Sequence, residues 1–375
     1  MPDSSPFSYV VLERHGGNSA DVDSGLMATH PALVAWTATS LPLLVVVAVS
    51  AAVSAGQPRP ASLLDGHVAI TNKASGALTI LNLRDLSTRI VKVGFLPHEA
   101  AVARRLVFVS NYGSAHVRSS DLANVPGNTL SVVDLARLDA PAETIDLGPG
   151  RCAPHGVAAT RNEQRVYVTC EGRQEVVAID VATRRVLHAI PTNQAGSHML
   201  AVSSDGARAY VANFWHGTVS VLDLSERTIV AQVSTGAGTE GISLSPDDRH
   251  LYTSSVYENE VRVIDTGTLQ VVRRAVMPDC RGALRVVPAP PSGRTLVVNC
   301  ADNDTVLLVD AATLEVRHRV RVGDQPIGID VPDDRFGFVA NMNDGTISVI
   351  DLKRGVVSRT LPAGDVPDGL VFLRP

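Results

Sequence analysis

Residues 154–190 decide the fold, because they contain four short apolar runs separated by charged or glycine-containing turns. The runs are Pro154-His155-Gly156-Val157-Ala158, Val166-Tyr167-Val168-Thr169-Cys170, Glu175-Val176-Val177-Ala178-Ile179-Asp180 and Arg185-Val186-Leu187-His188-Ala189-Ile190. Short runs rich in β-branched and aromatic residues are typical of four antiparallel strands in a meander. Such a meander cannot bury both of its faces alone, so we expect copies of it on either side.

Copies of this unit recur along the chain. The second run returns at Ala69–Asn72, Phe108–Asn111, Tyr167–Cys170, Tyr210–Asn213, Tyr252–Ser255, Val297–Cys300 and Phe338–Asn341. The third run usually closes on aspartate, at Asp134, Asp180, Asp223, Asp265, Asp310 and Asp351, with Asn82 in that place in the first copy. Seven copies with a period of about forty residues predict an all-β, seven-bladed β-propeller of four-stranded antiparallel blades.

The two ends of this region together complete one blade. The N-terminal copy has runs two to four, at 68–72, 78–83 and 88–93, but no first run before them. The C-terminal segment 369–373 is a first run with no copy after it. We therefore expect the C-terminal strand to join the N-terminal blade and close the ring, which removes both exposed sheet edges.

The repeat also resembles a known family. Tyr-Val-Thr-Cys at 167–170 and Tyr-Val-Ala-Asn at 210–213, the latter followed by 218–223, are similar to motifs of the YVTN-repeat (YncE-like) β-propeller family. The turns at 202–206 and 245–248 match its hairpin between strands one and two. The resemblance covers roughly residues 65–375 and implies a seven-bladed propeller. It fixes no function, because this fold hosts many.

The region before the repeats has its own character. Residues 1–31 are polar without periodicity and are expected to be disordered. Residues 32–55 are apolar and end near small residues of the kind that a signal peptidase reads, so they are predicted to be a signal peptide or an uncleaved membrane anchor. A linker at 56–64 then precedes the propeller at 65–375. We expect an exported protein, periplasmic or secreted, that touches a membrane only through this segment.

The four cysteines agree with export. Cys152 precedes the first run of its unit and Cys170 ends the second, and Cys280 and Cys300 occupy the matching places in a later unit. The start of strand one and the end of strand two lie side by side in a hairpin, so we predict the disulfides Cys152–Cys170 and Cys280–Cys300. Free cytosolic thiols are the weaker alternative, and a zinc site is weaker still because Cys-x-x-Cys spacing is missing.

One aligned position carries residues suited to chemistry. It lies just before or within the first strand of each unit and reads His98, His155, His198, Glu240, Arg281, Ile327 and Asp368. Innermost strands line the channel of a propeller, so three imidazoles and a carboxylate from consecutive blades would face one point at one mouth. We predict that His98, His155, His198 and Glu240 bind a divalent transition metal: Fe, Cu, Mn or Zn. The structural alternative is a set of histidines that bond to neighbouring loops.

Further residues are expected at the same mouth. Glu99 and Asp368 would complete or orient the ligand set, and Arg281 would clamp a substrate carboxylate or stabilise an oxyanion. The alternative for Arg281 is a salt bridge with Asp368 or Glu240. The candidate substrate-binding residues, on loops between strands two and three, are His116, Trp215, His216 and Tyr257. An insertion at 112–127 falls on the same face, and long insertions are often functional.

Composition narrows the function classes. A net charge of −5 and an aromatic content of 4% argue against a nucleic-acid surface, which needs a basic stripe and stacking rings. Three functions stay open for what we expect to be a monomer. They are a metal-dependent oxidoreductase or lyase acting on a small molecule, a non-catalytic propeller that binds a protein or cell-envelope ligand at the channel mouth, and a metal-independent lactonase or lyase.

Overall fold

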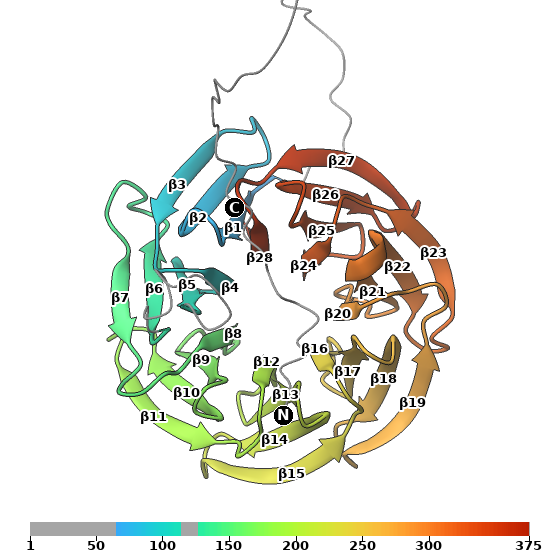
Figure 1. The fold of residues 1–375 in the computed structure, drawn as a ribbon, viewed down its shortest axis with the longest axis horizontal. Coiled ribbons are helices and arrows are strands. Elements are labelled where there is room, and N and C mark those ends of the chain that lie inside the picture. Colours follow the sequence, from blue (N-terminus) through green and yellow to red (C-terminus); the bar gives the residue numbers. More distant parts are fainter. Residues whose placement is uncertain (1–64, 114–126, 375) are drawn as a thin grey trace, which may run out of the picture. The chain divides into compact units, whose positions relative to one another are not determined.

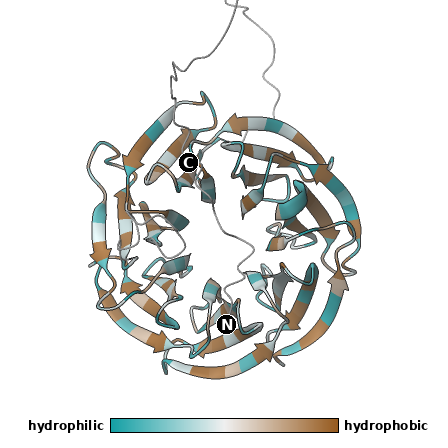
Figure 2. Cartoon of the chain, viewed as in Figure 1, coloured by the Kyte–Doolittle hydropathy of each residue, from teal (hydrophilic) through white to brown (hydrophobic). Residues whose placement is uncertain are grey.

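The computed structural model describes residues 65–113 and 127–374. Within them, 28 strands form seven four-stranded antiparallel sheets arranged as the blades of a ring (Figure 1). The predicted seven-bladed propeller is therefore confirmed. Hydrophobic residues recur on the strands of every blade (Figure 2). The proposed segments 1–31, 32–55 and 56–64 and the candidate residue His116 lie outside the described residues.

The first strand of each blade lies nearest the axis (Figure 1). These strands are β4 (Pro97–Ala103), β8 (Pro154–Ala159), β12 (Ser197–Val202), β16 (Thr239–Leu244), β20 (Ala283–Pro288), β24 (Pro326–Asp330) and β28 (Pro367–Leu373). The second strands are β1 (His67–Asn72), β5 (Leu106–Asn111), β9 (Arg165–Cys170), β13 (Arg208–Asn213), β17 (His250–Ser255), β21 (Thr295–Cys300) and β25 (Phe336–Asn341).

The outer two strands of each blade complete the sheets. The third strands are β2 (Ala77–Asn82), β6 (Thr129–Asp134), β10 (Glu175–Asp180), β14 (Thr218–Asp223), β18 (Glu260–Asp265), β22 (Thr305–Asp310) and β26 (Thr346–Asp351). The fourth strands are β3 (Thr88–Lys92), β7 (Glu143–Asp146), β11 (Val186–Pro191), β15 (Thr228–Ser234), β19 (Gln270–Val276), β23 (Val316–Arg321) and β27 (Val356–Pro362). A short 3-10 helix, η1 (Ala301–Asn303), follows β21.

The ring closes as predicted. Strand β28 pairs with β1 in the order β28-β1-β2-β3, with Leu373 opposite His67 and Pro367 opposite Asn72. The first blade therefore takes its innermost strand from the C-terminus. This pairing joins residues about three hundred positions apart and covers the edge of β1, so that β28 becomes the innermost strand of the sheet.

The repeated motif in the second strand holds each blade together and joins it to the next. Its aromatic residue packs between blades, as Tyr167 and Phe108 do at 0% exposure. Its closing asparagine donates to two hydroxyls of the third strand: Asn213 Nδ2 lies 3.0 Å from Thr218 Oγ1 and 2.9 Å from Ser220 Oγ. A buried amide with both partners in place rigidifies the blade at the end nearest the mouth.

The aspartate that closes the third strand caps the following turn. In β14, Asp223 Oδ1 accepts hydrogen bonds from the backbone N–H groups of Ser225 and Glu226, at 2.9 and 2.8 Å. The turn then continues through Arg227 at a φ of 61°. An aspartate side chain that binds backbone donors two and three residues later favours this reversal, which explains why the residue recurs.

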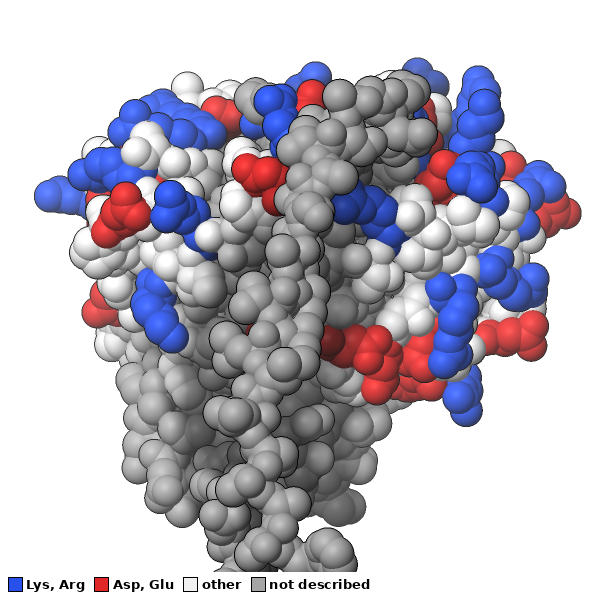
Figure 3. Space-filling view, turned by 90° about the horizontal axis from the view of Figure 1, so that it is seen from above, with Lys and Arg blue, Asp and Glu red and all other residues white. Residues whose placement is uncertain are grey.

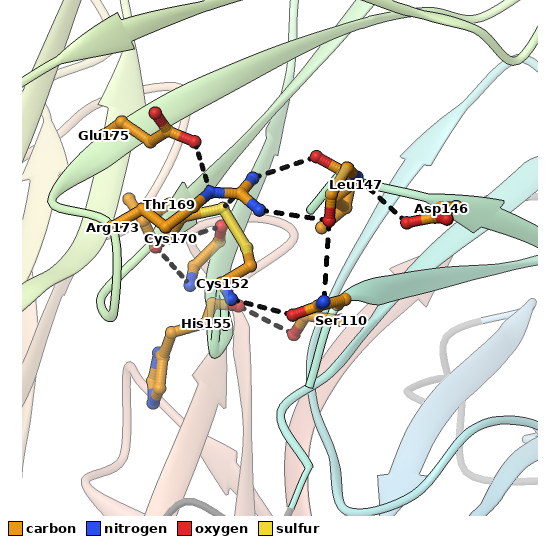
Figure 4. Close-up of a disulfide and its surroundings, with 12 residues drawn as sticks. Ser110, Asp146, Leu147, Cys152, His155, Thr169, Cys170, Arg173 and Glu175 are labelled. Carbon is orange, nitrogen blue, oxygen red and sulfur yellow. Dashed lines mark hydrogen bonds and ion pairs between the residues drawn. A yellow bond between two sulfur atoms is a disulfide. The ribbon is translucent and has the colours of Figure 1, made fainter. Parts of the chain in front are cut away.

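The two predicted disulfides are present and replace the asparagine clamp in their blades. Cys152 bonds to Cys170 and Cys280 to Cys300, with Cα–Cα distances of 4.5 and 5.2 Å. Figure 4 shows the first bridge beneath Arg173, with the side chain of His155 pointing away from it. Closing loops of 18 and 20 residues stabilises the fold by about 3 kcal/mol each in the chain-entropy model.

Charged side chains of both signs are mixed on the surface, and the helix content is low. On the face shown in Figure 3, lysine and arginine side chains lie interspersed with aspartates and glutamates over the described surface. Within residues 65–113 and 127–374, there is no helix of the length and apolar character that a bilayer crossing requires.

Candidate functional site at the channel mouth

A β-bulge at the same place in every first strand directs side chains to the axis. In all seven blades the pairing between the first and second strands gains one residue on the first strand, as between Pro97 and Ala100 or Pro154 and Val157. A bulge breaks the alternation of side chains and re-aims the residues within it. We call the second residue of each first strand the axial position and the third the bulge position.

The axial positions around the ring are polar in five consecutive blades. They are Asp368, His98, His155, His198 and Glu240, followed by Leu284 and Ile327. The register places Ala283 opposite Cys300, just as Pro154 lies opposite Cys170. Leu284 is therefore the axial residue of the β20 blade, and the sequence alignment that put Arg281 there was wrong by three residues.

The residue directly after each second strand forms another ring, which we call the rim position. Its members are Lys73, Tyr112, Glu171, Phe214, Val256, Ala301 and Met342. Together the two rings divide the mouth. The polar arc consists of the five polar axial residues with Lys73, Tyr112 and Glu171; the apolar arc consists of Leu284, Ile327, Phe214, Val256, Ala301 and Met342, which form one hydrophobic cluster.

The three histidines of the polar arc lie in a row. The ring centroids of His98 and His155 are 4.4 Å apart, and those of His155 and His198 are 3.7 Å apart. Hydroxyls of the preceding blades fix all three backbones: Thr71, Ser110 and Thr169 donate to the carbonyls of the three histidines in turn, at 2.6, 2.7 and 2.6 Å. The third residue of the repeated motif thus positions the axial residue of the next blade.

His198 is held between two carboxylates. Its Nε2 lies 2.7 Å from Glu240 Oε1, and its Nδ1 contacts Glu171, whose other oxygen accepts a bond from the Tyr112 hydroxyl at 2.6 Å. Burial alone would lower the pKa of His198, but the charges of Glu240 and Glu171 outweigh it and raise that pKa to about 10. At neutral pH this histidine is therefore an imidazolium.

His98 has a different environment at the other end of the row. Its Nδ1 lies 2.8 Å from Asp368 Oδ2, but Lys73 Nζ lies 2.9 Å from the same oxygen. Burial first, and then the Lys73 charge, lower the pKa of His98 to about 4 despite the attraction of Asp368. For the Asp368 carboxyl, the opposing effect of burial is overcome by Lys73 and His98, which lower its pKa. His98 is therefore neutral at pH 7.

Arg285 bridges the channel from the opposite side. It occupies the bulge position of β20, and its guanidinium lies 2.7 Å from Glu240 and 2.8 Å from Glu99, which occupies the bulge position of β4 on the far side of the ring (Figure 1). Burial opposes the charge of Arg285, but Glu99 and Glu240 raise its pKa. With Arg285 and His198 as partners, Glu240 has a pKa lowered to about 2, although burial acts to raise it. Burial raises the pKa of Glu99 in spite of Arg285.

The described residues contain a group of donor atoms with the spacing of a metal site. Ring nitrogens of His155 and His198 and a carboxylate oxygen of Glu171 lie within 4.8 Å of one another. Among the residues that the structure describes, the buried His155 Nδ1 has no hydrogen-bond partner, which is costly for a polar atom unless something binds it. Burial first, and then the neighbouring charge of His198, hold the pKa of His155 well below its usual range, so its ring is neutral and able to donate an electron pair.

The structure brings together most, but not all, of the predicted site residues. One contiguous network contains six of the predicted residues: His98, His155, His198, Glu240, Glu99 and Asp368. Arg281 lies outside it; its side chain is exposed and donates to the carbonyl of Asp302 at 3.2 Å. Trp215 and Tyr257 lie beside Phe214, with ring centroids 4.7 and 5.5 Å from it. His216 is exposed, and its Nδ1 accepts a bond from Ala195 N at 2.9 Å.

Sequence reasoning assigned no role to four contributors to the polar arc and its bridge: Lys73, Tyr112, Glu171 and Arg285. The first three share the rim position, a regular place in the repeat that alignment can reveal. Arg285 interrupts the otherwise apolar run 283–287 of an inner strand, and a charge in such a run is an unusual signal because buried charges need partners.

Comparisons with known proteins place the chain in a family. The model of the cytochrome d1 heme domain matches residues 161–370, more than half of the chain. The chain belongs to the cytochrome d1 heme domain family. A curated relative, the seven-bladed beta-propeller protein Rv1057 of Mycobacterium tuberculosis, is 26% identical over 117 residues; the match spans 30% of this chain and 30% of that protein.

Solved structures share the fold. A hydrazine synthase chain of Kuenenia stuttgartiensis has a TM-score of 0.63 at 18% identity, over 79% of this chain and 99% of that chain. A functionally unknown protein of Desulfotomaculum acetoxidans has a TM-score of 0.66 at 12% identity, over 83% and 99%. The dihydro-heme d1 dehydrogenase NirN in complex with DHE has a TM-score of 0.58 at 15% identity, over 83% and 66%. At these identities the likeness concerns the fold alone.

Proposed function

We propose that this propeller binds a divalent transition metal at its channel mouth and uses it to transform a small molecule. The observation that carries the proposal is the group of His155, Glu171 and His198, whose ligand atoms lie within 4.8 Å of one another. A metal ion would displace the proton from Nδ1 of His198, and the resulting set of two imidazoles and a carboxylate suits Fe, Cu, Mn or Zn. Three protein ligands leave a coordination position open for water or substrate, and a metal there supplies Lewis-acid or redox chemistry.

The remaining polar residues would support this set rather than enlarge it. Asp368 already engages His98 and Lys73, and Arg285 already engages Glu240, which in turn binds His198 Nε2 at 2.7 Å. Outer carboxylates of this kind orient metal-binding histidines and make them more basic. Of the four ligands predicted from sequence, we retain His155 and His198 and assign His98 and Glu240 to positioning.

The family match favours a second candidate, the binding of a haem-type group. Nδ1 of His155, which has no hydrogen-bond partner within residues 65–113 and 127–374, would hold the iron of such a group. The acidic residues fit less well: four carboxylates face this mouth, and the cations Lys73 and Arg285, which would pair with haem carboxylates, are already paired with Asp368, Glu99 and Glu240. The donor set therefore suits a small cation better than an anionic macrocycle.

Elemental analysis of purified full-length protein, loaded in turn with Zn, Cu, Mn and Fe and then dialysed, tests the first candidate. We expect about one tightly bound ion per chain, with Glu171→Gln and His155→Ala each weakening retention at least tenfold. His216→Ala is the matched control, because this exposed histidine lies outside the polar arc, and it should retain the metal fully.

The possible results of that experiment decide between the candidate functions. Full metal retention by Glu171→Gln would show that the three-residue set is wrong. If no metal is taken up but added haem gives a Soret band that His155→Ala abolishes, the second candidate replaces the first. If neither binds, a non-catalytic role in binding a protein or cell-envelope ligand takes precedence.

We also propose that the protein works outside the cytoplasm, as an exported monomer of the YVTN-repeat type. Two disulfides support an oxidising compartment, and the apolar segment 32–55 would direct export as a signal peptide or anchor. Fractionation of cells that express the full chain, with Val45→Arg and Val46→Arg to interrupt the apolar run, tests this. Export of the doubly substituted chain at the normal level would contradict it.

A further inference from the structure

The mouth of the channel is chemically divided, and its apolar half has no role in holding a metal. The apolar arc comes from four consecutive blades, β12 to β24, and its six side chains form one cluster. A ring built only to close the channel has no need for this separation, because alternating polar and apolar residues would fill the same space. The separation gives the mouth two chemically different walls that face one another.

The apolar arc continues outward to the surface through two exposed aromatic rings. Trp215 is 51% exposed and Tyr257 is 43% exposed, and both contact Phe214 edge to face. Phe214 also lies 5.7 Å from His198, measured between ring centroids. One continuous apolar surface therefore leads from solvent to the edge of the metal-binding group.

Glycines hold both exposed rings in place. A Cβ on Gly196 would approach Trp215 Cδ1 to 2.6 Å, and a Cβ on Gly238 would approach Tyr257 Cδ2 to 2.6 Å. Both glycines have a φ of 71°, a conformation that suits glycine. Each ring thus lies against backbone, which fixes its orientation at little entropic cost. Rigid aromatic surfaces of this kind recur in ligand sites.

We infer that the substrate of this site is a small molecule with an apolar body, aromatic or branched, attached to the polar group that reaches the metal. This inference rests on the proposed function. The apolar body lies against Phe214 between Trp215 and Tyr257, and the polar group points across Phe214 to His198 and Glu171. A molecule without an apolar face would leave this aromatic surface without a complementary partner and is disfavoured.

A pair of chelating probes distinguishes binding at the apolar arc from binding to the metal. Acetohydroxamate and benzohydroxamate carry the same metal-binding group, on a methyl and a phenyl respectively. We expect isothermal titration of the Zn-loaded full-length protein to give a roughly tenfold lower Kd for benzohydroxamate, because each buried carbon contributes about fourfold and the ring is partly exposed. Trp215→Ala with Tyr257→Ala should reduce this ratio at least threefold and leave the Kd of acetohydroxamate unchanged.

Control variants distinguish the preference for an apolar substrate body from the binding of the metal. Val272→Ala removes an equally exposed apolar side chain (47%) from the outer strand β19 and should keep the ratio. Phe214→Leu, which keeps the apolar volume should Phe214→Ala fail to fold, should lower it. If Zn binds but the two probes have equal Kd values, or the ratio survives in the double variant, the inference is wrong while the metal site stands.

If Zn does not bind, the proposed metal function fails, and the same two probes are titrated into the metal-free protein. A preference for benzohydroxamate that the Trp215 and Tyr257 double variant removes would still support the apolar substrate body. Equal binding of the probes, or no binding of either, would overturn it.

Discussion

His98 and His198 occupy the same position in two blades and carry opposite charge states. Each is mostly shielded from solvent and contacts at least one carboxylate, and a hydroxyl from the preceding blade holds the carbonyl of each. His98 shares one carboxylate with Lys73 and stays neutral, with a pKa of about 4, whereas His198 faces two carboxylates and becomes a cation, with a pKa of about 10. The repeat sets where an axial side chain lies, and its neighbours set what it does chemically.

The largest loss of unfolding free energy is expected at Arg285, whose guanidinium joins Glu99 to Glu240 beside His198. Replacing Arg285 by Gln leaves Glu99 and Glu240 without their shared cation, and loss of one partner from a buried ion pair costs about 3–5 kcal/mol of unfolding free energy. Urea unfolding of the metal-free protein at pH 7 measures it. Arg281→Gln, four residues away and exposed, should cost under about 0.5 kcal/mol; a similar cost for both would refute the assigned register and the bridge.

Replacing the two histidines in turn should give a smaller difference in the unfolding free energy that is lost. His198→Gln removes a cation from between Glu171 and Glu240 and should cost about 3 kcal/mol of unfolding free energy, for the same reason as at Arg285. His98→Gln removes a neutral ring whose carboxylate partner keeps Lys73, so about 1 kcal/mol is expected, the value of a hydrogen bond. Equal losses at pH 7 would mean that the two histidines share one charge state.

A pH dependence of stability, absent at neutral pH and growing as the pH falls, belongs to the His98 end. The pKa of His98 is near its ordinary value of 6.5 in the unfolded chain and about 4 in the folded one. Below pH 6.5 the unfolded state therefore binds the extra proton, and the folded state loses stability as the pH falls from about 6.5 to 4. His98→Gln should remove this part of the slope, up to about 3 kcal/mol by pH 4.

His198 should show the opposite pH window. Because its folded pKa is raised, the stability that it contributes is fully present below pH 6.5 and is lost as the pH rises through about 10. His198→Gln should therefore flatten the alkaline side of the stability profile and leave the acid side between pH 6.5 and 4 as in the wild type. Denaturant midpoints measured from pH 4 to 10 for both variants and the wild type test the pair together.

The fold followed from the sequence because its causes are local and repeated. A second strand that usually ends in Asn or Cys and a third that usually ends in Asp give the strand order, and the unmatched run at 369–373 gives the closure. The disulfides followed too, since repeat-equivalent positions such as Cys170 and Cys300 lie opposite the start of the first strand. Residues beyond the described ranges, His116 among them, stay predictions.

The candidate site was only partly predictable. Alignment found His98, His155 and His198 because a repeat turns equal sequence positions into neighbouring positions around an axis. It misplaced Arg281, because the loop before β20 is longer than in most other blades and the apolar Leu284 carries no chemical signal. Arg285 and Glu99, 186 residues apart, meet only because seven blades close into a ring.

The amino-acid sequence by itself determined the number of blades, their strand order, the closure and the covalent cross-links, since each depends on patterns within one or two units of the repeat. The tertiary structure decided which polar groups share a charge, which histidine holds a proton and which half of the mouth is apolar. These properties depend on distances of a few ångströms between side chains from blades far apart in the chain, and at such distances, away from water, a single neighbouring charge reverses a histidine's state.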